Sequence, residues 1–330
     1  MIKIYYYPSC PPGGYGNPYS SNVKNAFAKY GKVLDNENIP VKPAVKGLLR
    51  YCFKADVFLL NWIEGIANHR YGIIQYFLVF ICLFIIRLRR RKIVWTLHNI
   101  HPHGGANKFS EKLSTYLFRH VDIIIAHSKD AQDYAEKKAI CPVYYVCHPF
   151  NTYERDISPK EKTRDILIWG TIFPYKGVSQ FLQEVNSRKS DLTIRIVGTC
   201  SDAGLLNEIV RSAENNHRIV FENRRPDFKE IGELISTSKF VLFPYIGGSI
   251  SSSGALMDTI AMGGIAMGPN VGAFKDLSID KICLTYENYD DLFEKLRKGA
   301  QLSEHTIGTF VKYNTWDKFA GFIFNHLYMK

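Results

Sequence analysis

The chain has 330 residues, 46% of them apolar and 22% charged, and a formal net charge of +11. Its length suits two domains better than one compact core, and its apolar and charged fractions are those of a globular protein. The charge predicts an anionic partner: a nucleic acid, an acidic membrane surface or a phosphorylated small molecule. The seven cysteines are scattered and include no C-x-x-C pair. This argues against a disulfide framework or a structural zinc site and indicates reduced thiols in a cytoplasmic protein.

Strands and helices are expected to alternate in the first half of the chain. Apolar, strand-like runs lie at residues 1–7, 55–62, 92–99, 122–128 and 143–149. Segments with helical character lie between them, at residues 17–31, 76–86, 108–121 and 129–140. The first run lacks the basic region and long apolar stretch of a signal peptide. The β-α-β alternation predicts a parallel, doubly wound sheet.

The segment YFLVFICLFII, at residues 76–86, is uninterrupted apolar sequence. The basic residues that follow it are Arg87, Arg89, Arg90, Arg91 and Lys92. A membrane span needs about 20 apolar residues, so this run is too short for one. Two interpretations remain open, and one helix can satisfy both. The segment is either a buried core helix whose basic end suits the helix dipole, or a helix that rests part of its surface on an anionic leaflet.

A polar, charged stretch at residues 151–165 has the composition of a linker, and the alternation restarts after it. Expected strands then lie at residues 166–170, 192–198, 218–223, 239–245 and 265–269, and expected helices at residues 178–188, 203–215, 228–238, 254–264, 290–301 and 316–330. The sequence therefore predicts an α/β protein with two Rossmann-like domains that face each other across a cleft. The expected parts are an N-terminal domain at 1–155, a C-terminal domain at 156–312, and a helix at 313–330 that packs back towards the N-terminal domain.

Six stretches, in chain order, carry a resemblance to GT-B glycosyltransferases of the family 4-like group (glycosyl transferases group 1). They are GGYGNPYSSNV at 13–23, DVFLLNWIE at 56–64, WTLHNIHPH at 95–103, HPF at 148–150, GTIFPYKG at 170–177 and SSSGALMDTIAMGG at 251–264. The third and fifth stretches are specific in combination. The resemblance implies the GT-B fold, with an acceptor-binding N-terminal domain and a C-terminal domain that binds a nucleotide sugar.

The activity implied by this resemblance is that of a hexosyltransferase-type glycosyltransferase of class EC 2.4. It would move a sugar from a nucleotide diphosphate sugar to a lipid-linked saccharide acceptor in cell-surface polysaccharide or glycan synthesis. Together with the basic segment, this implies a cytoplasmic protein attached peripherally to the anionic inner face of the cell membrane. No cofactor, metal ion or nucleic acid is expected as a partner, and the chain has no D-x-D in a loop suited to a metal.

Two strand-to-helix turns in the second half suit a diphosphate, because cations and helix N-termini stabilise the negative charge that develops on the leaving group. The candidate residues in these turns are Tyr175, Lys176, Gly177, Ser251, Ser252, Ser253 and Gly254. Asp258, one turn into the following helix, is expected to accept hydrogen bonds from ribose hydroxyls. Simpler interpretations also stay open: an exposed lysine beside a turn, a flexible loop and a capping carboxylate.

Polar residues also follow the strand at 92–99. His98 is expected to lie in the cleft, where it hydrogen-bonds a sugar hydroxyl or acts as general base for an acceptor hydroxyl, with Asn99 holding it or the substrate. Gly13 and Gly14 open the N-terminal loop, where the acceptor or the diphosphate would approach the backbone. A hydrogen-bonded structural role for His98 stays open. Metal binding by the H-x-x-H-x-H pattern is disfavoured, because the following GGANKF supplies no carboxylate.

Two departures from the resembling family leave other functions open. Thr171 stands where the family has an arginine, and the first of the family's two donor-site glutamates falls near Ile250, so no carboxylate is present there. One alternative is therefore a catalytically weakened GT-B-like subunit or a sugar-nucleotide-binding protein. A remote alternative is a nucleic-acid-binding protein, because the basic charge and 20 tyrosines suit stacking on single strands. The missing G-x-x-x-x-G-K-[ST] and full G-x-G-x-x-G motifs disfavour a P-loop NTPase and a dinucleotide dehydrogenase.

Overall fold

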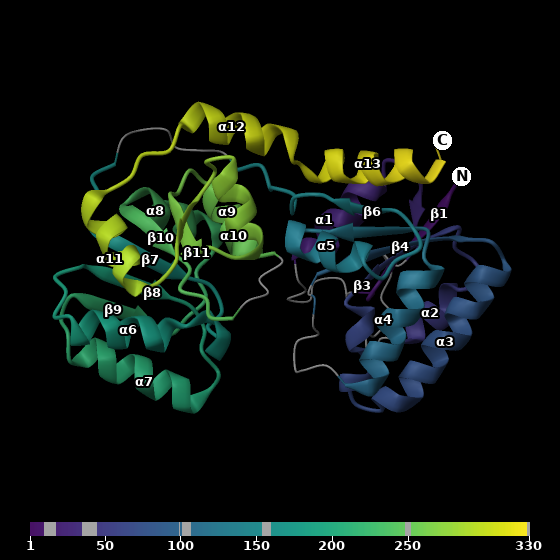
Figure 1. Cartoon of the computed structure of the whole chain (residues 1–330), viewed down its shortest axis with the longest axis horizontal. Helices are drawn as coiled ribbons and strands as arrows, with labels where there is room; N and C mark the ends of the chain where they lie inside the picture. The colour runs from purple at the N-terminus through teal and green to yellow at the C-terminus, as the bar shows by residue number, and fades with distance from the viewer. Residues whose placement is uncertain are drawn as a thin grey trace. The chain divides into compact units, whose positions relative to one another are not determined.

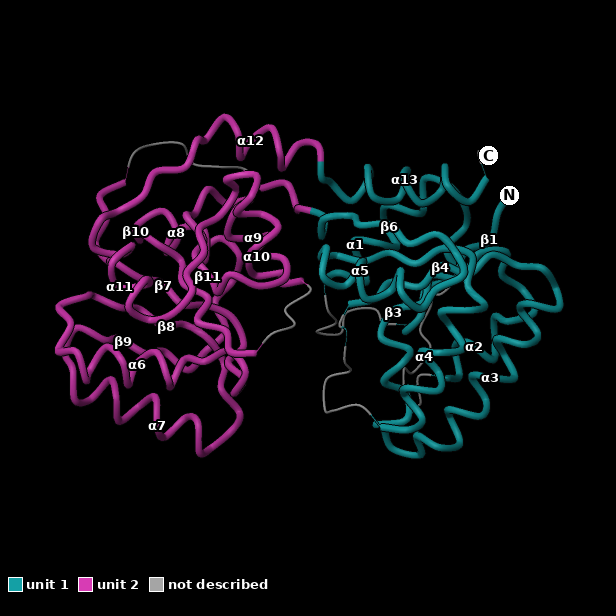
Figure 2. Tube along the Cα trace, in the orientation of Figure 1, with its two compact units in different colours: residues 1–149, 314–330 teal, residues 150–313 magenta. Residues whose placement is uncertain are grey.

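The computed structural model, whose helices and strands are shown in Figure 1, describes residues 1–9, 18–34, 45–98, 100, 107–153, 160–247 and 252–328. The chain forms two compact units, coloured separately in Figure 2. Unit 1 comprises residues 1–149 and 314–330, and unit 2 comprises residues 150–313. The chain therefore leaves unit 1 once and returns to it near its end.

Unit 1 is built on a six-stranded parallel sheet. Its strands are β1 (Lys3–Tyr7), β2 (Lys32–Val33), β3 (Val57–Asn61), β4 (Lys92–Leu97), β5 (Ile123–Ala126) and β6 (Val143–Tyr145). Their spatial order is β2-β1-β3-β4-β5-β6. Strand β1 pairs with both β2 and β3, so the winding direction reverses between β1 and β3, as in flavodoxin-type sheets.

Helices cover both faces of this sheet, which explains why its strands are continuous apolar runs. The helical elements of unit 1 are α1 (Pro18–Phe27), α2 (Val45–Tyr51), η1 (Ile63–Asn68), α3 (Gly72–Leu88), α4 (Lys108–His120), α5 (Lys129–Glu136) and α13 (Trp316–Tyr328). Helices α2, α3 and α4 pack with Trp95 on one face, whereas α1 and α13 pack with Val94 on the other. Figure 1 shows α1 beside α13, although they come from opposite ends of the chain.

Unit 2 is built on a second six-stranded parallel sheet. Its strands are β7 (Arg164–Trp169), β8 (Ile194–Val197), β9 (Ile219–Glu222), β10 (Ser238–Leu242), β11 (Ala266–Pro269) and β12 (Leu284–Tyr286). Its helical elements are η2 (Pro174–Lys176), α6 (Val178–Ser187), α7 (Ala203–Glu214), α8 (Phe228–Ser236), α9 (Gly254–Ala261), α10 (Gly272–Ile279), α11 (Tyr289–Lys298) and α12 (Glu304–Tyr313). The spatial order β12-β11-β10-β7-β8-β9 is the Rossmann order, with the reversal between β7 and β10.

The predicted α/β class with two doubly wound parallel sheets is confirmed. The elements that the sequence did not predict are β2, α2, α10, β12, α12 and the short helices η1 and η2. The strands among them have two and three residues, which is too short for an alternating pattern to show.

Helix α3 is buried in the protein core on one side only, so it matches the prediction of a core helix in part. It spans Gly72–Leu88 and is therefore longer than the apolar run that predicted it. Val79 and Leu83 are completely buried in the core of unit 1, whereas Phe84 keeps 65% of its surface exposed. In the described part of the chain, no helix has both the length and the apolar character needed to cross a membrane.

Candidate functional site

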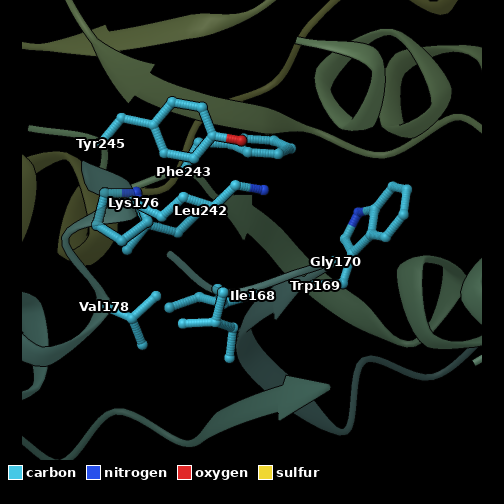
Figure 3. A pocket seen from close by; sticks show the side chains of 10 residues that line it. Ile168, Trp169, Gly170, Lys176, Val178, Leu242, Phe243 and Tyr245 are labelled. Carbon is cyan, nitrogen blue, oxygen red and sulfur yellow. The ribbon is translucent and has the colours of Figure 1, made fainter. Parts of the chain in front are cut away.

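A pocket lies in unit 2 where the winding of the sheet reverses, at the carboxyl ends of β7 and β10 (Figure 3). Its lining residues are Ile168, Trp169, Gly170, Ile172, Lys176, Val178, Leu242, Phe243, Pro244 and Tyr245. In open α/β sheets this reversal point is where ligands bind, because the connections on its two sides diverge and leave a crevice. The structure therefore places Lys176, a predicted site residue, where a ligand of unit 2 is expected.

Two glycines bring the backbone around this pocket closer together than side chains would allow. Gly177 has a φ of 64°, and a Cβ atom there would lie 2.0 Å from the carbonyl oxygen of Pro244. At Gly198, directly after β8, a Cβ atom would lie 1.9 Å from the carbonyl oxygen of Gly170. At both positions backbone therefore packs directly against backbone, which fixes the loops beside the pocket.

Lys176 is the charged residue among those lining this pocket. Its Nζ lies 5.3 Å from the ring centroid of Tyr245, and a Cβ atom built on Gly170 would lie 3.8 Å from the same Nζ. Its neighbour Tyr175 is 42% exposed, and the carbonyl oxygen of Tyr175 accepts a 2.9 Å hydrogen bond from the N–H of Ile246. This bond joins the loops that follow β7 and β10, so the ammonium group is held between an aromatic ring and glycine backbone.

The second predicted turn leads into α9, which begins at Gly254. Ser253 caps this helix, because its Oγ accepts a 3.3 Å hydrogen bond from the N–H of Leu256, and it also lies 3.2 Å from the hydroxyl of Tyr245. Gly254 is exposed, and a Cβ atom there would meet no described residue within 4 Å. Ser252 is half-buried. Anion binding at this turn would therefore involve backbone N–H groups more than the Ser253 hydroxyl.

Asp258 lies on α9 and is 8% exposed. Its Oδ1 accepts hydrogen bonds from Nδ2 of Asn151 at 2.9 Å and from the hydroxyl of Tyr153 at 2.8 Å. Burial raises the pKa of this carboxyl, and the two hydrogen bonds oppose the rise. The carboxylate therefore holds residues 151–153, at the start of unit 2, in place. The sequence assigned these residues to a linker. Its contact with a ribose stays a prediction.

Aromatic and imidazole rings gather in unit 1 at the carboxyl ends of its strands. The ring cluster consists of Tyr19, Trp62, His98, His127, His148 and Trp316. The ring of Tyr19 lies at its centre, with centroids of the five other rings 4.7–5.7 Å away in edge-on geometry. Trp316 begins α13, so residues from both ends of the chain meet in this cluster.

His98 follows β4 and is only 3% exposed. Its Nε2 lies 2.9 Å from Oδ1 of Asn61. Because an amide oxygen only accepts, Nε2 is the donor in this hydrogen bond. Trp62 stacks on the imidazole, with 4.1 Å between centroids and 17° between planes. This burial and stacking suit the hydrogen-bonded structural role that the sequence left open for His98.

Trp62 itself has an unusual backbone conformation. Its φ of 53° lies in the left-handed region, which bulky side chains rarely adopt and which carries strain of about 1–3 kcal/mol. The stacking on His98 and the edge contact with Tyr19 hold this conformation. Such local strain concentrates at functional sites, which adds weight to the ring cluster as a candidate site.

The other two histidines of the ring cluster are buried and neutral. Nδ1 of His127 donates to the carbonyl oxygen of Val146 at 2.7 Å, so its Nε2 accepts the hydroxyl of Tyr19 at 2.9 Å. Nδ1 of His148 donates to the carbonyl oxygen of Pro149 at 2.9 Å. Burial, with a contribution from His148, lowers the pKa of His127 to about 3, and burial lowers the pKa of His148 to about 4. Both rings are therefore uncharged near neutral pH.

Several predicted site residues, namely Gly13, Gly14, Asn99 and Ser251, lie outside the described residues, as do His101 and His103. The roles given to them by the sequence therefore stay predictions. Within the described ranges, no group of three or more histidine, cysteine, aspartate or glutamate residues has a geometry that could hold a metal ion.

Sequence reasoning did not single out Tyr19, His127, Gly198, Tyr245 or Trp316. His127 follows β5 directly, as His98 follows β4, so the same pattern could have identified it. Tyr245 lies three residues beyond the end of β10. Nothing local marks Trp316, because it reaches the ring cluster only through the return of α13 to unit 1.

No protein-family model matches the sequence, and no curated protein matches it. Solved structures do match. HepE of Anabaena, solved with UDP-glucose, has a TM-score of 0.63 at 14% identity, over 98% of this chain and 95% of that chain. AviGT4, a glycosyltransferase involved in avilamycin A biosynthesis, has a TM-score of 0.63 at 11% identity, over 99% and 96%. A glycosyltransferase from Rickettsia africae has a TM-score of 0.63 at 11% identity, over 98% and 97%.

These similarities extend over nearly the whole length of each chain and, at such low identities, define the fold. The protein has the GT-B fold, which consists of two Rossmann-like domains. The predicted fold class is thereby confirmed.

Proposed function

We propose that the protein is a glycosyltransferase that moves a sugar from a nucleotide diphosphate sugar to a saccharide acceptor. The observation that carries this proposal is the pocket at the reversal point of the unit 2 sheet, where a lysine lies beside glycine backbone. The similar structures support it, since HepE of Anabaena was solved with UDP-glucose and two others are glycosyltransferases.

The donor binds to unit 2. As its bond to the sugar breaks, negative charge develops on the diphosphate, and a preorganised cation stabilises that charge. Lys176 supplies the cation, Tyr175 and Gly177 shape the loop around it, and the first turn of α9 adds its dipole. Asp258 accepts from the ribose, either through its second oxygen or in exchange with Tyr153.

The acceptor binds to unit 1, near the ring cluster. His98 is the candidate base there, and its Nε2 donates to Asn61. A neutral imidazole in this state accepts a hydrogen bond from an acceptor or sugar hydroxyl and removes its proton as the new bond forms. Asn99 holds His98 or the substrate, and Gly13 and Gly14 admit the ligand to the backbone.

The finer proposal is a family 4-like hexosyltransferase of class EC 2.4 that needs no metal ion. Its acceptor is lipid-linked, and its product enters a cell-surface polysaccharide or glycan. The net charge of +11 and the basic end of α3 support a cytoplasmic protein attached to the inner face of the cell membrane.

A second candidate is a sugar-nucleotide-binding subunit with weak transfer activity. It is favoured by Asp258, whose carboxylate is already occupied by Asn151 and Tyr153. It is also favoured by Thr171, which is exposed and supplies no charge where the resembling family has an arginine.

Thermal shift of the full chain against UDP-, GDP-, ADP- and dTDP-linked sugars tests donor binding and names the nucleotide. The rate of hydrolysis of the stabilising donor then separates the two candidates, because a fully active enzyme releases nucleotide diphosphate much faster than a weakly active binding subunit. Activity that EDTA abolishes and manganese restores would overturn the metal-free part of the proposal. A chain that no nucleotide sugar stabilises would contradict both candidates.

A further inference from the structure

The outward side of α3 is a continuous apolar surface. We call it the α3 stripe; its members and their exposed fractions are Ile73 (54%), Ile74 (61%), Phe77 (59%), Ile81 (53%), Phe84 (65%) and Leu88 (72%). Residues three or four positions apart lie on one face of a helix, so these side chains run along its whole length. More than half of each is exposed to solvent, and contiguous apolar surface of this kind marks an interaction site.

Helix α2 packs beside α3 and extends this surface. Phe53, just beyond the end of α2, is 60% exposed, and Leu49, one turn earlier, is 38% exposed. Nη1 of Arg89 donates a 3.0 Å hydrogen bond to the carbonyl oxygen of Cys52. Phe53 therefore lies next to the basic end of α3, where apolar and cationic side chains meet.

The segment that carries this surface is strongly basic. Residues 45–92 include nine lysines and arginines but only two acidic residues. Asp56 is neutralised by Arg91 at 2.8 Å, and Glu64 is buried with 3% of its surface exposed. The described surface of this segment therefore combines apolar side chains with an excess of positive charge.

The structure also shows which cations are available to a partner. Arg87 and Lys92 pair with Asp122 at 3.3 Å and 3.5 Å, so part of the cluster seen in the sequence is internally neutralised. The exposed cations with no ion pair among the described residues include Lys46, Arg50, Lys54 and Arg90. They are the charges that an anionic partner would meet.

We propose that the α3 stripe docks onto an anionic lipid bilayer, with α3 lying in the plane of the interface. The charge complementarity favours this occupant over a second copy of the chain, because a copy would place the same basic surface against itself. Seventeen residues at about 1.5 Å each, with one face fixed in the protein core, suit a helix that lies on a bilayer. The inference rests on the proposed function and names the surface through which a lipid-linked acceptor is reached.

Co-sedimentation with vesicles tests this with the full chain. The vesicles are pure phosphatidylcholine or phosphatidylcholine with phosphatidylglycerol at about 7:3, each at low and high salt. We expect binding to the anionic vesicles that weakens in high salt, because surface charge attracts the basic side chains only within a Debye length.

Two variants and one control sharpen the test. The stripe variant carries Phe77→Ser and Phe84→Ser, and it should bind vesicles about tenfold or more weakly because apolar area is lost. The charge variant carries Arg50→Glu, Lys54→Glu and Arg90→Glu, and it should bind anionic vesicles more weakly at low salt. Ile279→Ser is the matched control, since Ile279 is 60% exposed at the end of α10 in unit 2. It should bind vesicles as the unchanged chain does.

Three results would overturn the docking surface. These are no vesicle binding by the unchanged chain, equal binding to neutral and anionic vesicles at both salts, or unchanged binding by the stripe variant. A dimer in sedimentation velocity that Phe77→Ser dissolves would instead identify the stripe as a contact between copies. Thermal shift with the sugar donors is measured in parallel. A chain that binds anionic vesicles but no donor would contradict the proposed function and not the docking surface.

Discussion

The two units share an architecture but place different chemistry at the same edge of their sheets. In unit 2, the carboxyl ends of β7 and β10 carry a lysine and glycine backbone, and the loop after β10 leads into the start of α9. In unit 1, the corresponding edge carries three buried histidines packed around Tyr19, and burial keeps His127 and His148 neutral. One edge suits negative charge, and the other suits hydroxyl groups and proton transfer.

This difference follows from burial. An exposed or half-buried lysine keeps its charge at little expense, whereas a buried imidazole loses its proton because desolvation penalises the cation. The same fold therefore gives an anion-binding site where the loops leave backbone open, and a neutral hydrogen-bonding site where aromatic rings close over the strand ends. The predictions below test that contrast.

Replacement of His98 by alanine should have the largest effect. If His98 removes the proton of the acceptor hydroxyl, turnover should fall about 10²–10⁴-fold, the usual contribution of a positioned proton-transfer group. The melting temperature should also fall, since the ring stacks on Trp62 and bonds to Asn61. Donor affinity should be unchanged, because the donor binds to unit 2.

His98→Gln is the matched variant, because its amide can keep the hydrogen bond to Asn61 but cannot act as a base. Steady-state turnover, thermal melting and donor titration of both variants separate chemistry from folding. Near-normal turnover together with a lower melting temperature would show that His98 is a structural residue only.

Replacement of Gly177 by alanine should deform the donor side. Its Cβ atom would lie 2.0 Å from the carbonyl oxygen of Pro244 at a φ of 64°, so both the contact and the conformation are unfavourable. We expect unit 2 to lose about 3 kcal/mol of unfolding free energy, as measured by urea titration. Gly232→Ala is the control, because Cβ there meets nothing within 4 Å inside α8 and should be neutral or stabilising. Equal stabilities of the two variants would contradict the close-approach argument.

Replacement of Lys176 by alanine should weaken donor binding by about 1.5–3 kcal/mol, the range for a hydrogen bond to a charged group. Isothermal titration with the donor found by thermal shift measures this directly. Lys275→Ala offers a control, because Lys275 is exposed on α10 of the same unit. Unchanged donor affinity in a folded Lys176→Ala variant would remove this residue from the phosphate site.

Acidification should destabilise unit 1. The loss is about 1.4 kcal/mol per pH unit for each proton that the unfolded chain binds and the folded chain does not. The pKa values of His127 and His148 fall from 6.5 to about 3 and about 4, so their stabilisation is complete above pH 6.5 and is lost as the pH falls below it. Burial raises the pKa of Glu64 from 4.5 to about 7. Its contribution therefore runs in the opposite direction, because the folded chain keeps a proton that the unfolded chain has released.

Between pH 6 and 5, the unfolded chain should therefore bind about one proton more than the folded chain. In the Glu64→Gln variant this difference should rise to about two protons, so stability should fall more steeply with pH. Hydrogen exchange of amides in β4 and β7, corrected for intrinsic rates, compares the two units at each pH. A flat stability profile in β4 would show that the histidines are charged in the folded protein.

Much of the fold could be predicted because its evidence is local. Apolar strand runs, amphipathic helices and glycine-bearing turns each depend on a few consecutive residues, and they identified two doubly wound domains. The position of Lys176 was equally local, since it follows a strand and precedes a helix. The strand orders could not be predicted, because the two units have the same alternation but reverse at different strands.

The surroundings of the candidate residues depend on contacts between distant parts of the chain. The sequence alone determined that His98 and Asp258 are polar groups beside elements of an α/β fold. Only the tertiary structure decided that His98 is stacked and buried, and that Asp258 is held by Asn151 and Tyr153. It also turned one apolar face of α3 outwards. Burial and pairing arise when segments far apart in sequence pack together, so they set charge and exposure that no local pattern contains.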